Sequence, residues 1–576
     1  MRTRIISNCR QAGAQVTLGL LVSGVMALTL LGACMNANAA NQMIAAAHPR
    51  AADVGAAVLD NGGTAADAAL ATQAMLNLVE PQSSGFGGGA FILYWDASTR
   101  QLITIDGRET APANAVPERF LDADGDKHGF WKSAVGGQAV GVPGTPAAFD
   151  LLHRLYGKLP RSQLLAPTIA LADAGFEVSP RLAKSVAVAK HLDRFEATRA
   201  YFFPDGQPIK QGAVLKNVAF AHTLRRFAER GAQGFYQGPV ASAIVDAVNA
   251  SSFVTRNITL ADLAGYRAKI RPAICMPYRA YEVCGMGPPT SGGLTVGQML
   301  GMLSRFDLKA MGWGESLVHH IAEAAKLAYA DRALYMADSD FVKMPTRGLV
   351  DAKYLQARSQ LIDPQKAGPR AQAGKPPGAA DLAWSPSALN SLPGTSHFVV
   401  WDKFGNAASI TTTIESGFGS RVMAAGILLN NELTDFDRQP EVDGRAVANR
   451  VQGGKRPRSS MSPTIVFRDH EPYLLVGSPG GSRIIGYVAK TLIGILDFGM
   501  TPQGAVNKGH FIHRNGNALE LEKGSGAATM RIALEAKGHV VKLRGLSSGL
   551  HAILKQDDGF IGGADPRREG KVIGTP

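Results

Sequence analysis

The chain has 576 residues, of which 45% are hydrophobic and 19% are charged, which is the composition of a folded globular protein with ample material for a core. This length fits several domains or one large α/β body. The formal net charge is +13, but there is no long Lys/Arg run and no basic stripe interleaved with aromatic residues, so we expect no nucleic-acid partner.

The N-terminal segment has the features of a secretory signal. Arg2, Arg4 and Arg10 form a basic start without an acidic residue, and the stretch 16–31 is apolar and uncharged. Because that stretch is too short and too early for a membrane span, we predict a signal peptide that is removed from the mature protein.

Two cleavage sites compete at the end of this segment. Leu31-Gly32-Ala33-Cys34 resembles a lipoprotein box, in which a signal peptide of residues 1–33 is removed and Cys34 becomes the acylated first residue. The run Ala37-Asn38-Ala39 offers an ordinary site, with the signal ending at residue 39 and Cys34 discarded. We favour the lipoprotein because Cys34 directly follows the apolar run. Both alternatives predict a periplasmic protein, and the first adds a membrane anchor at Cys34.

An alanine-rich segment with helical spacing runs from Pro49 to Val79. It is interrupted at Asn61-Gly62-Gly63, which is typical of a helix C-terminus, and Thr64 is placed to start a second helix. Pro81 ends that helix. We therefore predict two consecutive helices.

A glycine cluster, residues 83–89, comes next. The runs Ala90–Trp95 and Gln101–Ile105 that follow are predicted to form a strand pair. Because the glycines precede a strand instead of following one, they lack the context of a dinucleotide-binding loop, and we predict no such cofactor site.

The middle of the chain, residues 141–340, is predicted to be mostly helical. Thr259 has the character of a helix N-cap, and residues 316–335 form a longer helix. His319 and His320 are adjacent instead of four residues apart, and no acidic partner motif accompanies them, so no metal site is predicted there. We expect no metal and no cofactor anywhere in the chain.

The chain has four cysteines, and Cys9 leaves with the signal under either cleavage. Cys275 and Cys284 flank the segment 276–281, with strand-like runs on both sides, so they are predicted to lie opposite one another in a hairpin. An oxidising compartment would permit a disulfide between them. Two unpaired, half-buried thiols are an equally good interpretation.

Residues 363–392 are rich in Pro, Ala and Gly and describe an irregular connector that ends at Gly394. From Thr395 the pattern changes to β, with runs over 396–401 and 407–414. The connector thus leads directly into a sheet at Gly394-Thr395, which is where a self-cleaving precursor would be cut.

Thr395 is the candidate nucleophile. A threonine hydroxyl is a weak nucleophile and needs a base within hydrogen-bond reach. A cut before Thr395 would create an α-amino group, which is neutral near pH 7 far more readily than a lysine and can serve as that base. Taken alone, the position of Thr395 is weak evidence for a nucleophile, because threonine is common at the start of strands for its β-propensity.

The surrounding motifs strengthen this hypothesis. They comprise Asp106–Pro112, Gly141–Gly144, Pro288–Gly293, Thr395–His397, Gly405–Ala407, Thr411–Thr413, Phe418–Ser420, Gly426–Asn431, Asp435-Phe436, Lys455–Thr464 and Gly477–Arg483. With them the chain resembles the γ-glutamyltransferase (γ-glutamyltranspeptidase) family over essentially its whole mature length. The runs Pro-Arg-Ser-Ser-Met-Ser-Pro-Thr and Gly-Ser-Pro-Gly-Gly-Ser-Arg are the most specific.

The resemblance implies an α+β protein with the four-layer αββα fold of the N-terminal nucleophile hydrolases. It also implies self-cleavage between Gly394 and Thr395, into a large chain (34–394) and a small chain (395–576) that stay together and form the fold jointly. The implied activity is hydrolysis or transfer of the γ-glutamyl group of glutathione and related γ-glutamyl compounds, with water, an amino acid or a peptide as acceptor.

The resemblance also assigns roles to single residues. Thr395 would be the nucleophile, Thr413 would support it, and Gly480 and Gly481 would offer backbone N–H groups to the developing oxyanion. The remaining implied residues bind the substrate: Arg108 its α-carboxylate, with Ser459 and Ser460 adding hydrogen bonds, and Asp435 its α-ammonium, with Glu415 and Glu432 where relatives carry Asn, Gln or Glu.

Alternation places His397 on the same strand face as Thr395, but the family uses the amino terminus as base, so we assign His397 a structural role.

The loop 437–454 is shorter than the lid of some family members and lacks the tyrosine of that lid. An open acceptor side is the consequence we expect.

Three alternatives to a γ-glutamyl enzyme are a cephalosporin or glutaryl-amide acylase of the same fold, a non-catalytic exported lipoprotein, and a nucleic-acid-binding protein. An acylase handles a side chain without an α-ammonium, and Asp435 argues against it. The retained Thr395 and Gly480-Gly481 argue against the non-catalytic lipoprotein. No motif supports nucleic-acid binding.

Overall fold

The computed structural model describes residues 40–379, 384–387 and 394–575. The predicted signal peptide, with Cys9 and Cys34, lies outside these residues, as do two parts of the predicted connector. Among the described residues, none of the helices combines the length and the apolar character needed to cross a membrane.

The first of two central sheets has seven antiparallel strands, drawn from both ends and the middle of the chain. In spatial order they are β22 (Lys571–Thr575), β1 (Gln42–Ala46), β9 (Thr395–Trp401), β10 (Ala407–Thr413), β2 (Gly89–Asp96), β3 (Gln101–Gly107) and β6 (Lys269–Arg271). The strand that begins at Thr395 therefore lies near the centre of this sheet.

The second sheet has six antiparallel strands. In spatial order they are β21 (Gly559–Ala564), β20 (His551–Gln556), β16 (Glu471–Gly477), β15 (Thr464–Arg468), β8 (Tyr281–Gly285) and β7 (Ile274–Tyr278).

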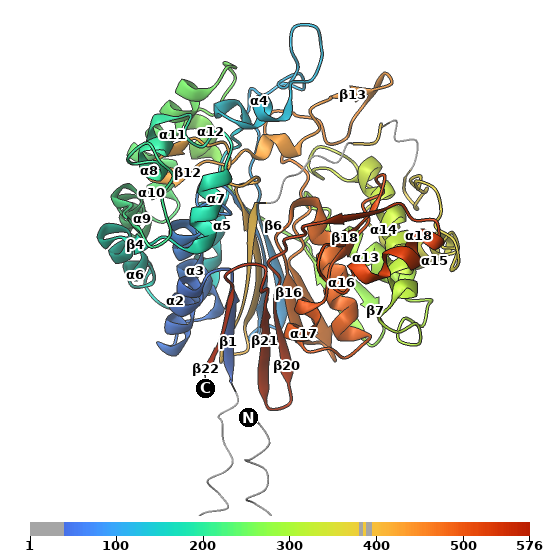
Figure 1. The fold of residues 1–576 in the computed structure, drawn as a ribbon. Helices are drawn as coiled ribbons and strands as arrows, with labels where there is room; N and C mark the ends of the chain where they lie inside the picture. The colour runs from blue at the N-terminus through green and yellow to red at the C-terminus, as the bar shows by residue number, and fades with distance from the viewer. Residues whose placement is uncertain (1–39, 380–383, 388–393, 576) are drawn as a thin grey trace, which may run out of the picture. The chain divides into compact units, whose positions relative to one another are not determined.

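Side chains of the first sheet alternate between two hydrophobic cores, as the period of a strand requires. Ile92 and Val400 face the helices α2 (Pro49–Asp60), α3 (Ala65–Val79), α5 (Thr145–Tyr156), α6 (Arg161–Ala174) and α9 (Val218–Arg230). Leu93 and Val399 face the second sheet, whose core continues into α13 (Gly292–Leu303), α14 (Glu315–Tyr335) and α16 (Ile484–Leu496). Figure 1 shows the sheets between these two helical groups, which confirms the predicted αββα layers.

The remaining elements complete the fold around these layers. The helices are α4 (Phe130–Ala134), α7 (Pro180–Val188), α8 (Glu196–Phe202), α10 (Gln233–Tyr236), α11 (Pro239–Ser251), α12 (Leu260–Gly265), α15 (Ala352–Ser359), α17 (Pro502–Asn507) and α18 (Arg531–Ala536), with 3-10 turns at Gly137–Ala139, Gly348–Val350, Glu432–Asp435, Gly481–Arg483 and Ala528–Met530. The strands are β4 (Phe176–Glu177) with β5 (Val214–Leu215), β11 (Met423–Ala424) with β12 (Ile427–Leu428), β13 (Glu441–Val442) with β14 (Arg445–Ala446), and β17 (Phe511–Ile512), β18 (Leu519–Glu522) and β19 (Val541–Arg544) together.

The local predictions agree with this structure. Helices α2 and α3 are separated at the predicted glycines, and Thr64 caps α3 through a capping box with Asp67. Thr259 caps α12 in the same way. In the hairpin β7–β8, Cys275 lies opposite Cys284, and the two residues form a disulfide.

Candidate active site

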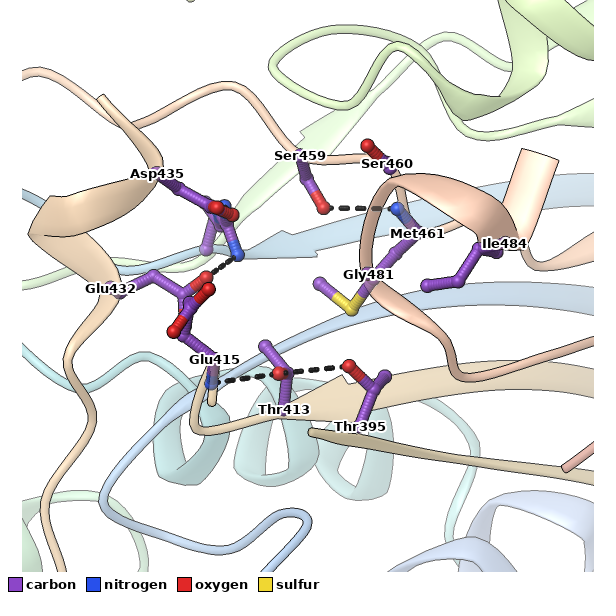
Figure 2. Close-up of a pocket in the computed structure, with 11 residues that line it drawn as sticks. Thr395, Thr413, Glu415, Glu432, Asp435, Ser459, Ser460, Met461, Gly481 and Ile484 are labelled. Carbon is purple, nitrogen blue, oxygen red and sulfur yellow. Dashed lines mark hydrogen bonds and ion pairs between the residues drawn. The ribbon is translucent and has the colours of Figure 1, made fainter. Parts of the chain in front are cut away.

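Thr395 and Thr413 face one another on neighbouring strands. They form the last register pair of β9 and β10, and their Oγ1 atoms are 3.2 Å apart. Thr413 also accepts a hydrogen bond of 2.9 Å from the backbone N–H of Glu415, which itself has a φ of 75°. Such a φ is uncommon outside glycine, and it turns the chain sharply after β10. Figure 2 shows the two hydroxyls pointing at each other.

The carbonyl oxygen of Gly394 accepts a hydrogen bond from each of these two hydroxyls. Thr395 Oγ1 and Thr413 Oγ1 each donate to it over 2.7 Å. A Cβ at Gly394 would come within 2.5 Å of the backbone of Ser416 and Gly417, so only glycine fits here. The peptide bond before Thr395 is thus held against the Thr395 hydroxyl, with two donors polarising its carbonyl group.

A small pocket opens at these two threonines and gathers most of the predicted site residues. Its lining consists of Arg108, Thr395, Thr413, Glu415, Glu432, Asp435, Ser459, Ser460, Met461, Gly481 and Ile484. Figure 2 places the three acidic residues to the left of the two threonines, and the serines and Gly481 above them. Met461 and Ile484, which we did not predict, supply its apolar contact.

Of the predicted oxyanion-hole pair, Gly481 lines the pocket and Gly480 precedes it in the chain. Gly480 has a φ of 140°, and a Cβ there would lie 2.6 Å from the Tyr487 ring. The 3-10 turn Gly481–Arg483 leads directly into α16. Because the first N–H groups of a helical segment lack intrahelical acceptors, this end presents backbone donors where the pocket meets Thr395.

Arg108 is the cation of the pocket, and its side chain is almost fully buried. Its guanidinium pairs with Glu432 and, over 2.6 Å, with Asp435, while Nε donates to the carbonyl of Pro457 over 3.1 Å. Burial alone would lower the pKa of Arg108, but Glu432 and Asp435 more than offset it and the pKa is raised. Arg108 is therefore permanently charged.

Acidic groups outnumber this cation. Burial raises the pKa of Glu109 to about 7, against the opposing effect of Arg108 3.8 Å away. Burial, with Glu109 and Asp435 nearby, also raises the pKa of Glu432 well above its usual value despite Arg108. Glu415 lines the same side and accepts a hydrogen bond of 2.6 Å from Asn431. The pocket thus pairs one fixed guanidinium with several carboxyl groups, which suits a ligand that carries both a carboxylate and an ammonium.

The two serines are held by groups that we did not predict. Ser460 Oγ accepts a hydrogen bond of 2.7 Å from Arg332, which also donates to Ser291 over 2.7 Å. Ser459 Oγ accepts from the N–H of Met461 over 3.0 Å. Arg332 lies on α14 and is buried. Its burial results from the packing of this helix against the loop of Ser459, which the sequence pattern of the helix does not indicate.

Arg568 is another residue that was not predicted from the sequence. It donates to the backbone oxygen of Thr395 over 2.7 Å and lies 3.7 Å from Glu80. Glu80 in turn accepts from Ser396 over 2.7 Å. These contacts join the C-terminal part of the chain to the first residues of β9, which no local pattern near Arg568 indicates.

His397 is packed inside the sheet and bonds to the neighbouring strand. It is fully buried, and its Nδ1 shares a hydrogen bond of 2.9 Å with Thr411 on the neighbouring strand. Burial lowers the pKa of His397 well below its usual value, with His551 adding to the effect. A neutral histidine bonded to Thr411 is consistent with the structural role that we assigned to it.

The loop 437–454 forms a short hairpin of β13 and β14. Its tip, residues 443–445, reaches the surface, and Figure 1 shows the hairpin projecting from the layers.

Comparisons with known proteins give one consistent result. A family model described as gamma-glutamyltranspeptidase matches residues 51–575. The chain is 36% identical over 545 residues to the glutathione hydrolase proenzyme of Bacillus subtilis (strain 168), covering 92% of this chain and 91% of that one. It is 38% identical over 537 residues to the glutathione hydrolase proenzyme of Escherichia coli (strain K12), covering 91% and 90%. Among solved structures, the cephalosporin acylase from Bacillus halodurans superposes with a TM-score of 0.81 at 27% identity, covering 93% of this chain and 96% of that one.

Proposed function

Because the chain belongs to the gamma-glutamyltranspeptidase family, we propose that it cleaves the γ-glutamyl amide bond of glutathione and related compounds through an ester on Thr395. The group then passes to water or to the amine of an amino acid or peptide. The observation that carries this proposal is the convergence of Thr395, a buried Arg108 and several carboxyl groups on one pocket.

The first reaction is the cut that activates the precursor. Thr395 Oγ attacks the carbonyl carbon of Gly394, and the C–N bond breaks as the hydroxyl proton ends on the nitrogen of Thr395. Water then hydrolyses the resulting ester, which leaves a carboxylate on Gly394 and a free amine on Thr395. Thr413, 2.7 Å from the oxygen that gains negative charge, stabilises that charge in the transition state.

In turnover the new amine accepts the Thr395 hydroxyl proton as Oγ attacks the γ-carbonyl of the donor. The N–H groups of Gly480 and Gly481 stabilise the oxyanion, and the leaving amine takes the proton. The γ-glutamyl ester on Thr395 is then attacked by water or by an acceptor amine, which restores the hydroxyl.

The α-carboxylate and the α-ammonium of the donor replace partners in the ion pairs that Arg108 makes with the acidic residues of the pocket. Its α-carboxylate takes the place of a carboxylate on Arg108, with the hydroxyls of Ser459 and Ser460 beside it. Its α-ammonium takes the place of the guanidinium beside Asp435 and Glu432, in the pocket that Glu415 also lines. Because the pocket offers an opposite charge to the carboxylate and to the ammonium of the donor, a zwitterionic γ-glutamyl group fits better than a glutaryl group, which lacks the ammonium.

Two assays test this proposal together. On a denaturing gel, the wild-type protein should appear as two fragments and Thr395→Ala as one uncut chain. Wild-type enzyme should also hydrolyse γ-glutamyl anilides faster than glutaryl anilides. An uncut wild type counts against the nucleophile, whereas a preference for glutaryl anilides indicates an acylase instead of a γ-glutamyl enzyme.

We also propose that the protein is exported to the periplasm, with a lipid anchor on Cys34. The support is the basic, then apolar, sequence before Cys34. Mass spectrometry of the mature protein from membranes tests this, since an acylated residue 34 and a start at residue 40 differ by both mass and sequence. A start at residue 40 would exclude the anchor.

A further inference from the structure

Three potential metal ligands converge outside the pocket of Thr395. His319 and Glu323 lie four residues apart on one face of α14, and His539 follows α18. One ligand atom from each lies within 4.8 Å of the other two. All three side chains are at most 6% exposed. From the sequence we found no acidic partner motif beside His319 and His320 and predicted no metal site, so the helical spacing from His319 to Glu323 was missed.

The hydrogen bonds of His319 leave its Nδ1 lone pair directed at His539. His319 Nε2 is 2.7 Å from the carbonyl oxygen of Asp363, which can only accept, so Nε2 carries the ring proton. Nδ1 is therefore unprotonated, and it lies 2.8 Å from His539 Nε2. Metal-binding histidines are usually oriented in this way, by a carbonyl or carboxylate that accepts from the other ring nitrogen.

Glu323 completes the set with a buried oxygen whose charged partner is Lys326. Its Oε2 accepts the N–H of Gly368 over 3.1 Å, whereas Oε1 lies 4.0 Å from His539 Nε2. Lys326 Nζ is 2.7 Å from Oε1, a cation that opposes a metal ion, but it also donates to the carbonyl of Gly368 over 2.6 Å. Lys326 therefore keeps a partner when Oε1 turns toward the histidines.

We propose that His319, Glu323 and His539 bind one zinc-type transition-metal ion. Two imidazoles and a carboxylate suit Zn²⁺ and its neighbours, whereas Ca²⁺ and Mg²⁺ require mostly oxygen ligands. Metal–nitrogen bonds of about 2.0 Å in a tetrahedral site place the two nitrogens about 3.3 Å apart, so the imidazoles need to separate by only about 0.5 Å. The His539 proton moves from Nε2 to Nδ1, and water fills the fourth position.

Such an ion would join the two chains of the processed protein. His319 and Glu323 lie before Gly394, and His539 lies after Thr395. This consequence rests on the proposed cut, but metal binding itself does not. The uncut Thr395→Ala protein should therefore bind the same amount of metal as the wild type.

Zinc titration of the tag-free, EDTA-dialysed full protein tests the site. We expect one Zn²⁺ per wild-type chain, measured by calorimetry and by elemental analysis after desalting, and no binding of Ca²⁺. His539→Ala and Glu323→Gln should each weaken Zn²⁺ binding by more than about 100-fold, because loss of a residue that merely orients a ligand already costs about 10- to 100-fold. His222→Ala, which removes an exposed histidine of α9, is the matched control and should bind as the wild type does.

The absorption spectrum of bound Co²⁺ tests the site in the wild-type protein and so does not depend on whether the variants fold. Co²⁺ bound to the wild-type protein should give the visible absorption of a four-coordinate site, and Zn²⁺ should abolish it. Absence of stoichiometric zinc, or equal affinity in the wild type and a folded His539→Ala, would overturn the proposal. Failure of the Gly394–Thr395 cut with normal zinc binding would overturn only the link between chains.

Discussion

Thr413 is a residue whose contacts would change with the proposed cut before Thr395. In the uncut chain its hydroxyl donates to the Gly394 oxygen and lies 3.2 Å from the Thr395 hydroxyl. After the cut, the first of these partners becomes a carboxylate that is free to leave, and the second remains. Thr413 is therefore expected to matter more for processing than for turnover.

We predict that Thr413→Ala slows the self-cleavage by about 10²- to 10³-fold, the usual cost of removing one oxyanion donor. The rate is measured as the appearance of the small chain on denaturing gels after purification of freshly made precursor. Thr413→Ser keeps the hydroxyl and serves as the control, which should be cut at close to the wild-type rate. Equal rates for the Ala and Ser variants would remove Thr413 from the reaction.

Glu109 makes the pocket sensitive to pH near neutrality. Its raised pKa of about 7 means that the carboxyl is protonated below pH 7 and ionised above it. Ionised Glu109 adds negative charge behind Arg108 and Glu432, where we propose that the α-ammonium of the donor binds. We therefore predict that kcat/KM for a γ-glutamyl donor falls as the pH decreases from 8 to 5.

The variant Glu109→Gln separates this effect from titration of the Thr395 amine, which occurs in both proteins. Its kcat/KM should be lower at pH 8 and should fall less steeply toward pH 5. The sign for stability is the opposite: a carboxyl whose pKa is raised in the fold is most favourable while protonated. Wild-type stability is expected to decline, relative to Glu109→Gln, as pH rises from about 4.5 through 7. Parallel pH profiles for the two proteins would show that Glu109 does not titrate in this range.

At the scale of elements, the hairpin β7–β8 depends on its disulfide. Strand β7 is the edge of the second sheet and pairs only with β8, whereas β8 also pairs with β15. The bond between Cys275 and Cys284 closes a separation of nine residues, for which loop entropy gives about 2–3 kcal/mol.

We predict that the double substitution Cys275→Ser/Cys284→Ser speeds amide exchange in Ile274–Tyr278 by about 30- to 150-fold, which corresponds to that free energy. Hydrogen exchange measured by mass spectrometry on the hairpin peptide checks this. The β20–β21 hairpin in the same sheet contains no cysteine and should exchange unchanged. Activity is expected to persist, since neither cysteine lines the pocket. Unchanged exchange in β7 would mean that pairing with β8 suffices.

Individual elements could largely be predicted from local pattern. The break between α2 and α3, the caps at Thr64 and Thr259, and the start of β9 at Thr395 all follow from neighbouring residues. The order of strands could not, because β1 pairs with β22 from the other end of the chain. No periodicity in either segment encodes that partnership.

The residues of the site likewise fall into those that local motifs predict and those that only the tertiary structure brings together. The motifs around Thr395, Arg108 and Ser459 carried the resemblance to the family, and their residues do meet in one pocket. Arg332 and Arg568 escaped prediction because each reaches the site from a distant segment. Their significance arises from burial and from the backbone or hydroxyl oxygens they contact, which are properties of tertiary packing.

Across the whole molecule, the two chains that the proposed cut between Gly394 and Thr395 would make are interleaved through both sheets. Residues before Gly394 supply β1, β2, β3 and β6 to the first sheet, and residues after it supply β9, β10 and β22. Strand pairs β22–β1, β1–β9 and β10–β2 therefore cross between the chains, and β15–β8 does so in the second sheet. Both hydrophobic cores also draw on the two chains.

Because each chain leaves sheets incomplete without the other, we predict that the processed protein unfolds as one unit. The two fragments should co-elute in size-exclusion chromatography without denaturant and should lose structure in a single urea transition, followed by circular dichroism and by elution volume together. The uncut Thr395→Ala protein is the reference, and its transition should lie at higher urea at low protein concentration, since one continuous chain does not dissociate. Elution of a folded small chain by itself below the transition would show that the sheets do not depend on the pairing between chains.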